Sequence, residues 1–79
     1  MTLQPNQLRE IDRTILKYLR EGRVRTSYVR KRIIGEEVRE SITSQYIGQR
    51  LQRLAEHDHV KNLLESGLYE LVDDPESGQ

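Results

Sequence analysis

Residues 42 to 54 read ITSQYIGQRLQRL, and this stretch decides which fold the chain can adopt. Thr43 is a favourable helix N-cap, because its hydroxyl can accept a hydrogen bond from a backbone N–H of the first turn. Ile42 precedes the cap and Ile47 occupies the fourth helical position, so the two side chains can pack together as a hydrophobic staple. The stretch therefore predicts a helix whose start is set at Thr43.

The apolar positions of this helix continue from Ile47 through Leu51 and Leu54, which share one face at helical spacing. Asp58 tolerates the left-handed backbone conformation better than most residues and can end the helix. We expect a helix over residues 43 to 57 that buries one apolar face.

The opposite face of this helix carries glutamine and arginine, with no carboxylate between Ile42 and Ala55. A helix against DNA avoids acids because DNA is a polyanion; the alternative is an ordinary amphipathic helix whose solvated side is rich in these residues. Glutamine can pair with adenine and arginine with guanine, mainly from the N-terminal part of a helix in the major groove. The candidate base-contacting residues are Ser44, Gln45, Tyr46, Gln49, Arg50 and Arg53.

Two further helices are expected upstream. Apolar residues at helical spacing predict a helix over residues 7 to 21, capped by Asn6 and ended by Gly22. Residues 23 to 26 suit a short strand because basic and neutral side chains alternate there.

A second helix is expected to start with Thr26 or Ser27 as its cap and to continue to Ile34. Residues 35 to 41, GEEVRES, form the turn that follows. This helix carries Arg30, Lys31 and Arg32, and Tyr28 near its start can bond a phosphate or lie on the surface.

Two short apolar runs, residues 60 to 64 and 68 to 72, flank the turn Glu65-Ser66-Gly67, in which glycine supplies a positive φ. They predict a β-hairpin. The acidic segment 73 to 79 is expected to be disordered.

The order helix, short strand, helix, helix, hairpin is the layout of a winged helix-turn-helix domain, an α+β fold. The hairpin is the wing, and the short strand can pair with it to make a three-stranded sheet. We place this domain at residues 7 to 72, between a flexible N-terminus, residues 1 to 6, and the acidic tail. In this motif the second helix crosses the DNA backbone, where Arg30, Lys31 and Arg32 would bind phosphates.

The formal net charge is zero, but all 13 basic residues lie between Arg9 and Lys61. That segment also holds eight acids, so its formal charge is +5, whereas residues 62 to 79 hold five acids and no base. The uneven distribution favours a polyanion partner for the body of the domain; a solvated surface of mixed charge is the alternative.

Several other classes of function lack the residues they need. The chain has no cysteine, and no apolar run is long enough for a signal-peptide core or a membrane span. His57 and His59 have no further zinc ligands nearby. Glu36, Glu37 and Glu40 have no nucleophile or phosphate-binding loop beside them. We expect a cytoplasmic protein that is not an enzyme and holds no metal or other cofactor.

The segments SQYIGQRLQRLAEHDHV (44–60) and GLYELVDDP (67–75) resemble the small winged-helix regulators of halophilic archaea, a group that includes proteins likened to the repressor of phage phi-H. The resemblance covers about residues 8 to 75. It implies a repressor that binds double-stranded DNA sequence-specifically, as a dimer, with the helix at 43 to 57 in the major groove. It also assigns the wing contacts to Lys61, Asn62, Glu65 and Ser66.

Small repressors read two half-sites, so we expect a homodimer, with the first helix as the interface through Leu16 and Leu19. The alternative function is a winged-helix adaptor that binds another protein and no DNA, because a fold alone does not settle a function. RNA binding would need an aromatic platform for stacked bases, which the chain lacks. No small-molecule substrate is evident.

Overall fold

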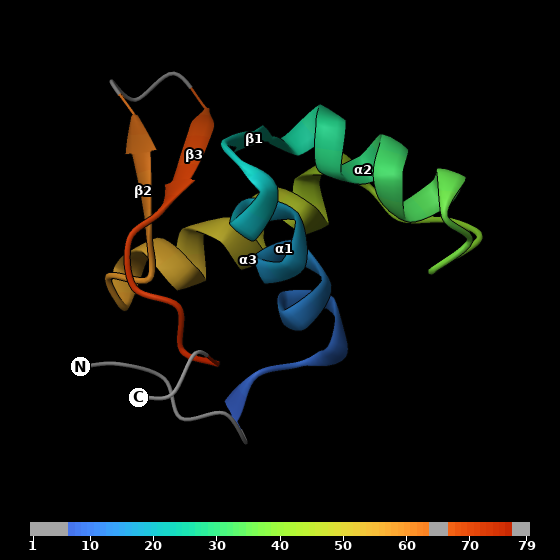
Figure 1. The fold of residues 1–79 in the computed structure, drawn as a ribbon. Coiled ribbons are helices and arrows are strands. Elements are labelled where there is room, and N and C mark those ends of the chain that lie inside the picture. The colour runs from blue at the N-terminus through green and yellow to red at the C-terminus, as the bar shows by residue number, and fades with distance from the viewer. Residues whose placement is uncertain (1–6, 64–66, 77–79) are drawn as a thin grey trace.

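The protein is a small α+β domain, as its sequence predicts (Figure 1). The computed structural model describes residues 7 to 63 and 67 to 76. Within these ranges it contains α1 (Glu10–Glu21), β1 (Val24–Arg25), α2 (Thr26–Gly35), α3 (Ser44–Glu56), β2 (Val60–Leu63) and β3 (Leu68–Leu71). This order of elements is compatible with a winged helix-turn-helix.

The three strands form one antiparallel sheet in the order β1-β3-β2. Val60 pairs with Leu71 across the hairpin, and Val24 of β1 pairs with Tyr69 of β3. Gly67, at the end of the hairpin turn, has a φ of 84°, which glycine adopts without strain. The predicted hairpin, its pairing with the short strand and the positive φ of this glycine are confirmed.

The core lies where the three helices meet the sheet, and α1 crosses α3 in Figure 1. Its most deeply buried apolar side chains include Ile11, Ile15, Leu16, Tyr18, Val29, Ile33, Ile47, Leu51 and Leu54. Burying one such aliphatic side chain contributes about 1.5–3 kcal/mol. The apolar stripes of the helices thus supply most of the packing in a chain that has no Phe or Trp.

Leu16 and Leu19 belong to this core, with exposed fractions of 0% and 3%. The prediction that these two side chains form a dimer interface is therefore wrong, because the domain itself covers them. Helix α1 buries a wider face than one stripe: residues 15 and 16, and 18 and 19, are buried in adjacent pairs. A homodimer stays a prediction, and it needs another surface.

A buried ion pair joins α1 to α3. The Arg50 guanidinium donates from Nε to Asp12 Oδ1 (2.8 Å) and from Nη2 to Asp12 Oδ2 (2.6 Å), and Asp12 is only 1% exposed. Asp12 also accepts from the backbone N–H of Arg9 at 2.9 Å, which satisfies a donor at the start of α1. Asp12 therefore serves both as a helix cap and as the partner of Arg50.

Helix α1 begins at Glu10, with Arg9 at the N-cap position, three residues later than predicted. The cap comes from Asp12 reaching back along the chain, a contact that the spacing of apolar residues does not reveal. Asn6, the predicted cap, lies outside the described residues.

The predicted boundaries of α3 match the structure closely. Thr43 Oγ1 accepts from the backbone N–H of Tyr46 at 3.1 Å, and Ile42 and Ile47 are both buried. After Glu56 the chain leaves the helix through Asp58, whose φ of 63° is left-handed. Cap, staple and helix end are thus confirmed, whereas α2 begins at Thr26 itself, with Arg25 at its N-cap position.

A second network joins α1 to α2 around Arg32. Its guanidinium binds Glu21 and Glu36 and lies 4.2 Å from the centre of the Tyr18 ring. The Tyr18 hydroxyl donates to Glu36 at 3.0 Å. Burial, and then this hydrogen bond, raise the pKa of Tyr18 to about 12.

The first residues of the segment predicted to be disordered pack against the domain. Arg20 of α1 binds Asp74 and Glu76, in each case with a donor–acceptor distance of 2.9 Å. Buried His59 donates from Nδ1 to the Asp73 carbonyl at 2.7 Å, and its own carbonyl accepts from the N–H of Asp73 at 3.1 Å. Composition alone indicated a solvated tail, but these acids meet arginine on α1; residues 77 to 79 lie outside the described range.

Removing Asp12 should destabilise the domain strongly. Asp12→Ala leaves the Arg50 guanidinium largely buried without its partner, a change that typically costs about 3–5 kcal/mol. Urea unfolding followed by circular dichroism measures the loss. Asp12→Ala combined with Arg50→Ala should lose less than the two single losses added together, because no charge is then stranded. Simple additivity would contradict the pairing.

Asp74→Asn should lower stability at neutral pH and have no effect in strong acid. The hydrogen bond from Arg20 lowers the pKa of Asp74 below its usual 3.8. The pair therefore stabilises the fold above the unfolded-state pKa, and its contribution is lost as the pH falls through the lower folded-state pKa. Because Arg20 is 40% exposed, we expect a loss of about 0.2–1 kcal/mol at about pH 7.

Urea unfolding at the two pH values measures this difference. Asp73→Asn is the matched control, since its exposed carboxylate has no recorded partner among the described residues. A loss that is equal at both pH values would exclude the ionised pair as its cause.

Candidate nucleic-acid interface

The exposed face of α3 is a row of uncharged and basic side chains. Ser44, Gln45, Gln49, Gln52 and Arg53 are all exposed. Within the described ranges, none of them makes a hydrogen bond or an ion pair through its side chain. We call these five residues the α3 face.

The local sequence explains why these side chains point outward. Ile47, Leu51 and Leu54 are 0–1% exposed and hold the opposite side of the helix in the core. Gln45 and Gln49 are two positions from Ile47, so they turn away from the core. Gln52 is two positions from Leu54, and Arg53 is two positions from Leu51, so both also face solvent. The first acid on the α3 surface is Glu56, at the last helical position.

Arg50 does not belong to this face. It is bonded to buried Asp12, its side chain is 12% exposed, and the hydrogen bond to Asp12 raises its pKa. The prediction that Arg50 contacts a base is therefore corrected: its guanidinium joins α3 to α1. The sequence pattern missed this because Asp12 is 38 positions away.

Tyr46 is only partly exposed and packs against the core. It also contacts Arg39, a residue that was not among the predicted site residues. The Arg39 guanidinium, from the loop before α3, lies 5.7 Å from the centre of the Tyr46 ring. Arg39 is exposed, so this contact places a cation beside the first turn of α3. A turn described only as long and charged gave no signal for this placement.

The basic residues of α2 have different fates. Arg30 is exposed but donates from Nε to the carbonyl of Ile42 at 2.8 Å, which ties α2 to the start of α3. Lys31 is exposed, with no side-chain partner recorded in the described part of the chain. Arg32 is committed to Glu21 and Glu36, so its predicted phosphate contact is corrected.

Tyr28 lies on the surface, 45% exposed, and its hydroxyl accepts from Arg32 at 3.3 Å. The surface position is observed, and the phosphate contact stays a prediction. Tyr28 and Lys31 are three residues apart on α2, and both are exposed.

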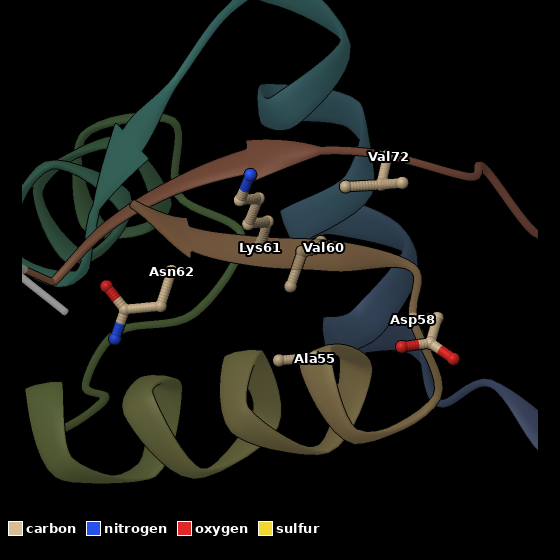
Figure 2. Close-up of a pocket in the computed structure, with 6 residues that line it drawn as sticks. All are labelled: Ala55, Asp58, Val60, Lys61, Asn62 and Val72. Atoms are coloured by element: carbon tan, nitrogen blue, oxygen red, sulfur yellow. The ribbon is translucent and has the colours of Figure 1, made fainter. Parts of the chain in front are cut away.

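The predicted wing residues diverge. Figure 2 shows Val60 and Asn62 pointing toward α3 and Lys61 pointing to the other side of β2, as alternation along a strand requires. Asn62 Oδ1 accepts from the N–H of Gly67 at 2.9 Å, so this side chain holds the hairpin turn. Lys61 is exposed and its wing contact stays a prediction, whereas Glu65 and Ser66 lie outside the described residues.

An open groove of about 370 Å³ runs between the C-terminal end of α3 and β2 (Figure 2). It is lined by Ala55, Asp58, Val60, Lys61, Asn62 and Val72. The groove lies at the opposite end of α3 from Thr43, so it is separate from the start of the α3 face.

Ion pairs neutralise much of the basic stretch at residues 20 to 32. Arg20 pairs with Asp74 and Glu76, and Arg23 pairs with Glu70 at 3.0 Å. Arg32 is likewise paired. The positive charge available to a polyanion is consequently smaller than a count of basic residues indicates.

Gly48 is the one residue inside α3 that disfavours a helix strongly. Glycine inside a helix is destabilising by roughly 0.5–1 kcal/mol relative to alanine. A Cβ built on Gly48 would have no heavy atom within 4 Å outside its own helix backbone and chain neighbours. Nothing in the described fold therefore requires glycine at this partly exposed position.

The described residues contain no group of three or more His, Cys, Asp or Glu side chains placed to hold a metal ion. His57 forms the C-cap of α3, and His59 is buried against the Asp73 carbonyl. Over the same residues, no helix has both the length and the apolar character needed to cross a bilayer.

Comparison of the chain with protein-family models, with curated proteins and with solved structures found no match. The resemblance to haloarchaeal winged-helix regulators therefore stays a hypothesis carried by residues 44 to 60 and 67 to 75. The α3 face and its surroundings are the features of the molecule that indicate a function.

Gly48→Ala should stabilise the folded protein. Alanine has the higher helix propensity, and its methyl group would enter open space. We expect the free energy of unfolding to rise by about 0.5–1 kcal/mol in urea titrations. Gly67→Ala is the contrasting control, because the φ of 84° there disfavours a side chain. A destabilised Gly48→Ala would show that the helix needs glycine for its own packing.

Proposed function

We propose that the protein is a winged helix-turn-helix transcription regulator that binds double-stranded DNA sequence-specifically and represses by occupying its operator. One observation carries the proposal: α3 presents amide, hydroxyl and guanidinium groups without side-chain partners in the described structure, and no acid before Glu56. These groups match the donors and acceptors on base edges in the major groove. The resemblance of residues 44 to 60 to haloarchaeal regulators agrees with this function.

The surroundings of α3 supply phosphate contacts. Arg30 and Arg39 lie near the first turn, through the Ile42 carbonyl and the Tyr46 ring respectively. Lys31 is exposed on α2, which precedes α3 and packs against it. Such cations would hold the DNA backbone and set the register of α3 without reading sequence.

The ion pairs favour the alternative function, a winged-helix adaptor that binds protein and no DNA. Arg20, Arg23 and Arg32 are neutralised by carboxylates, so the surface is less basic than that of a protein relying on nonspecific phosphate attraction. An adaptor would use the α3 face for polar contacts with a protein partner. The two functions differ in whether binding requires nucleic acid.

Fluorescence anisotropy with duplex DNA at several salt concentrations tests the proposal. Arg53→Ala should weaken binding to a selected operator by about 1–3 kcal/mol, as expected for loss of one good base contact. Lys31→Ala should weaken binding to all duplexes similarly and reduce the slope of log K against log salt by about 1. Lys31 is a cleaner probe than Arg30, because Arg30 also bonds to Ile42.

Lys17→Ala is the matched control, since it removes the same charge from the exposed side of α1. Folded protein that binds no duplex even at low salt would overturn the proposal and leave the adaptor function. Equal effects of Lys17→Ala and Lys31→Ala would remove the assignment of α2 to the interface.

A further inference from the structure

The N-terminal half of the α3 face carries two glutamine side chains, Gln45 and Gln49, on the same side of the helix. Gln45 and Gln49 are four residues apart, so they lie on one side of the helix and about 6 Å apart along its axis. Successive base pairs are stacked about 3.4 Å apart. The two amides are thus spaced to meet bases about two steps apart.

The hydrogen-bonding groups of glutamine indicate which base these side chains would contact. A glutamine amide both donates and accepts, and it matches the N6 amino group and the N7 acceptor of adenine. Arg50, the only charged side chain between Gln45 and Gln52, is withdrawn to Asp12. The beginning of the face therefore presents neutral hydrogen-bonding groups to the groove and no guanidinium.

The far end of the face indicates how the helix would approach DNA. Glu56 is exposed at the last helical position, where a carboxylate near phosphate would weaken binding. The first turn has the opposite character, with Arg30 and Arg39 beside it. This difference in charge between the two ends of α3 favours insertion of its N-terminal half into the groove.

Gly48 lies between the two glutamines in sequence and supplies a separate observation. The domain has no steric need for glycine there, yet retains the helix-destabilising residue. A missing Cβ allows another molecule to approach the helix backbone closely. Glutamine has a short reach compared with arginine, so it contacts a base edge only if the helix lies deep in the groove.

We propose that α3 reads a DNA half-site containing two adenines about two base pairs apart, through Gln45 and Gln49, and that Gly48 permits the close approach these contacts need. The inference rests on the proposed DNA-binding function and adds the class of sequence recognised. Gln45 and Gln49 are its specificity-determining residues. Arg53, with its longer side chain, would reach a guanine further along the same half-site.

Selection from a pool of random duplexes with the full chain, followed by sequencing, identifies the preferred site. We expect enrichment of two adenines at the stated spacing. With the selected duplex, Gln45→Ala and Gln49→Ala should each lower affinity about 5- to 150-fold. Lys17→Ala, on the exposed side of α1 and outside the α3 face, is the control and should have little effect.

Replacing one selected adenine by 7-deazaadenine removes only its N7 acceptor. Loss of this single hydrogen bond should lower wild-type affinity about 3- to 10-fold. At the adenine that Gln49 reads, the replacement should have no further effect on Gln49→Ala, because the partner amide is already gone. Equal effects in wild type and in both glutamine variants would overturn the residue-to-base assignment.

Gly48→Ala separates recognition from folding. We expect it to bind the selected duplex roughly fivefold or more weakly, as an added methyl group does in a closely packed contact, although the free protein is more stable. Unchanged affinity would overturn the role of Gly48. An enriched site without adenines would overturn the half-site while leaving DNA binding intact, whereas no enrichment and no retained DNA would remove both inference and proposed function.

Discussion

The bidentate contact between Asp12 and Arg50 is the constraint on which the rest of the arrangement depends. It fixes the rotation of α3 about its own axis relative to α1, because Arg50 is bonded through two of its nitrogens. Ile47 and Leu51 enter the core from the same side of α3. With Arg50, Ile47 and Leu51 directed into the domain, the α3 face is directed toward solvent.

Arginine in this domain has two separate uses. Arg32 and Arg50 cross-link helices through carboxylates, and Arg20 holds the C-terminal segment to α1. Arg53 and Arg39 have no carboxylate partner recorded in the described residues and remain exposed. A count of charges cannot separate these uses, because the acids that decide them are often distant in sequence. This is why the charge pattern overstated the basic surface.

The sequence predicted what depends on neighbouring residues. Thr43, Asp58 and Gly67 each act within one turn of the chain, and their roles as cap, helix end and hairpin turn were predicted correctly. The order of the expected helices and strands along the chain also predicted the α+β class and the three-stranded sheet. These features follow from backbone geometry and short-range hydrogen bonds, which a single sequence contains.

What could not be predicted depends on long-range contacts. Arg50 belonged to the right helix but has a buried partner on α1, and Leu19 is covered by other elements of the same domain. Arg39 became a candidate only when its position beside Tyr46 was known. The helix of the candidate site was therefore predicted correctly, but some of its individual residues were not. Gly48 was added to the site because nothing in the described fold requires glycine at that position.

The order of strands has a consequence for how the chain acquires its structure. The central strand, β3, is the last one synthesised, and β1 and β2 are joined only through it. The Arg20 contact with Asp74 likewise closes a sequence separation of 54 residues. A nascent chain that stops before β3 holds three helical segments and two strands with no common partner. The sheet can consequently form only after β3 has been synthesised, and a truncation that removes β3 abolishes the sheet entirely.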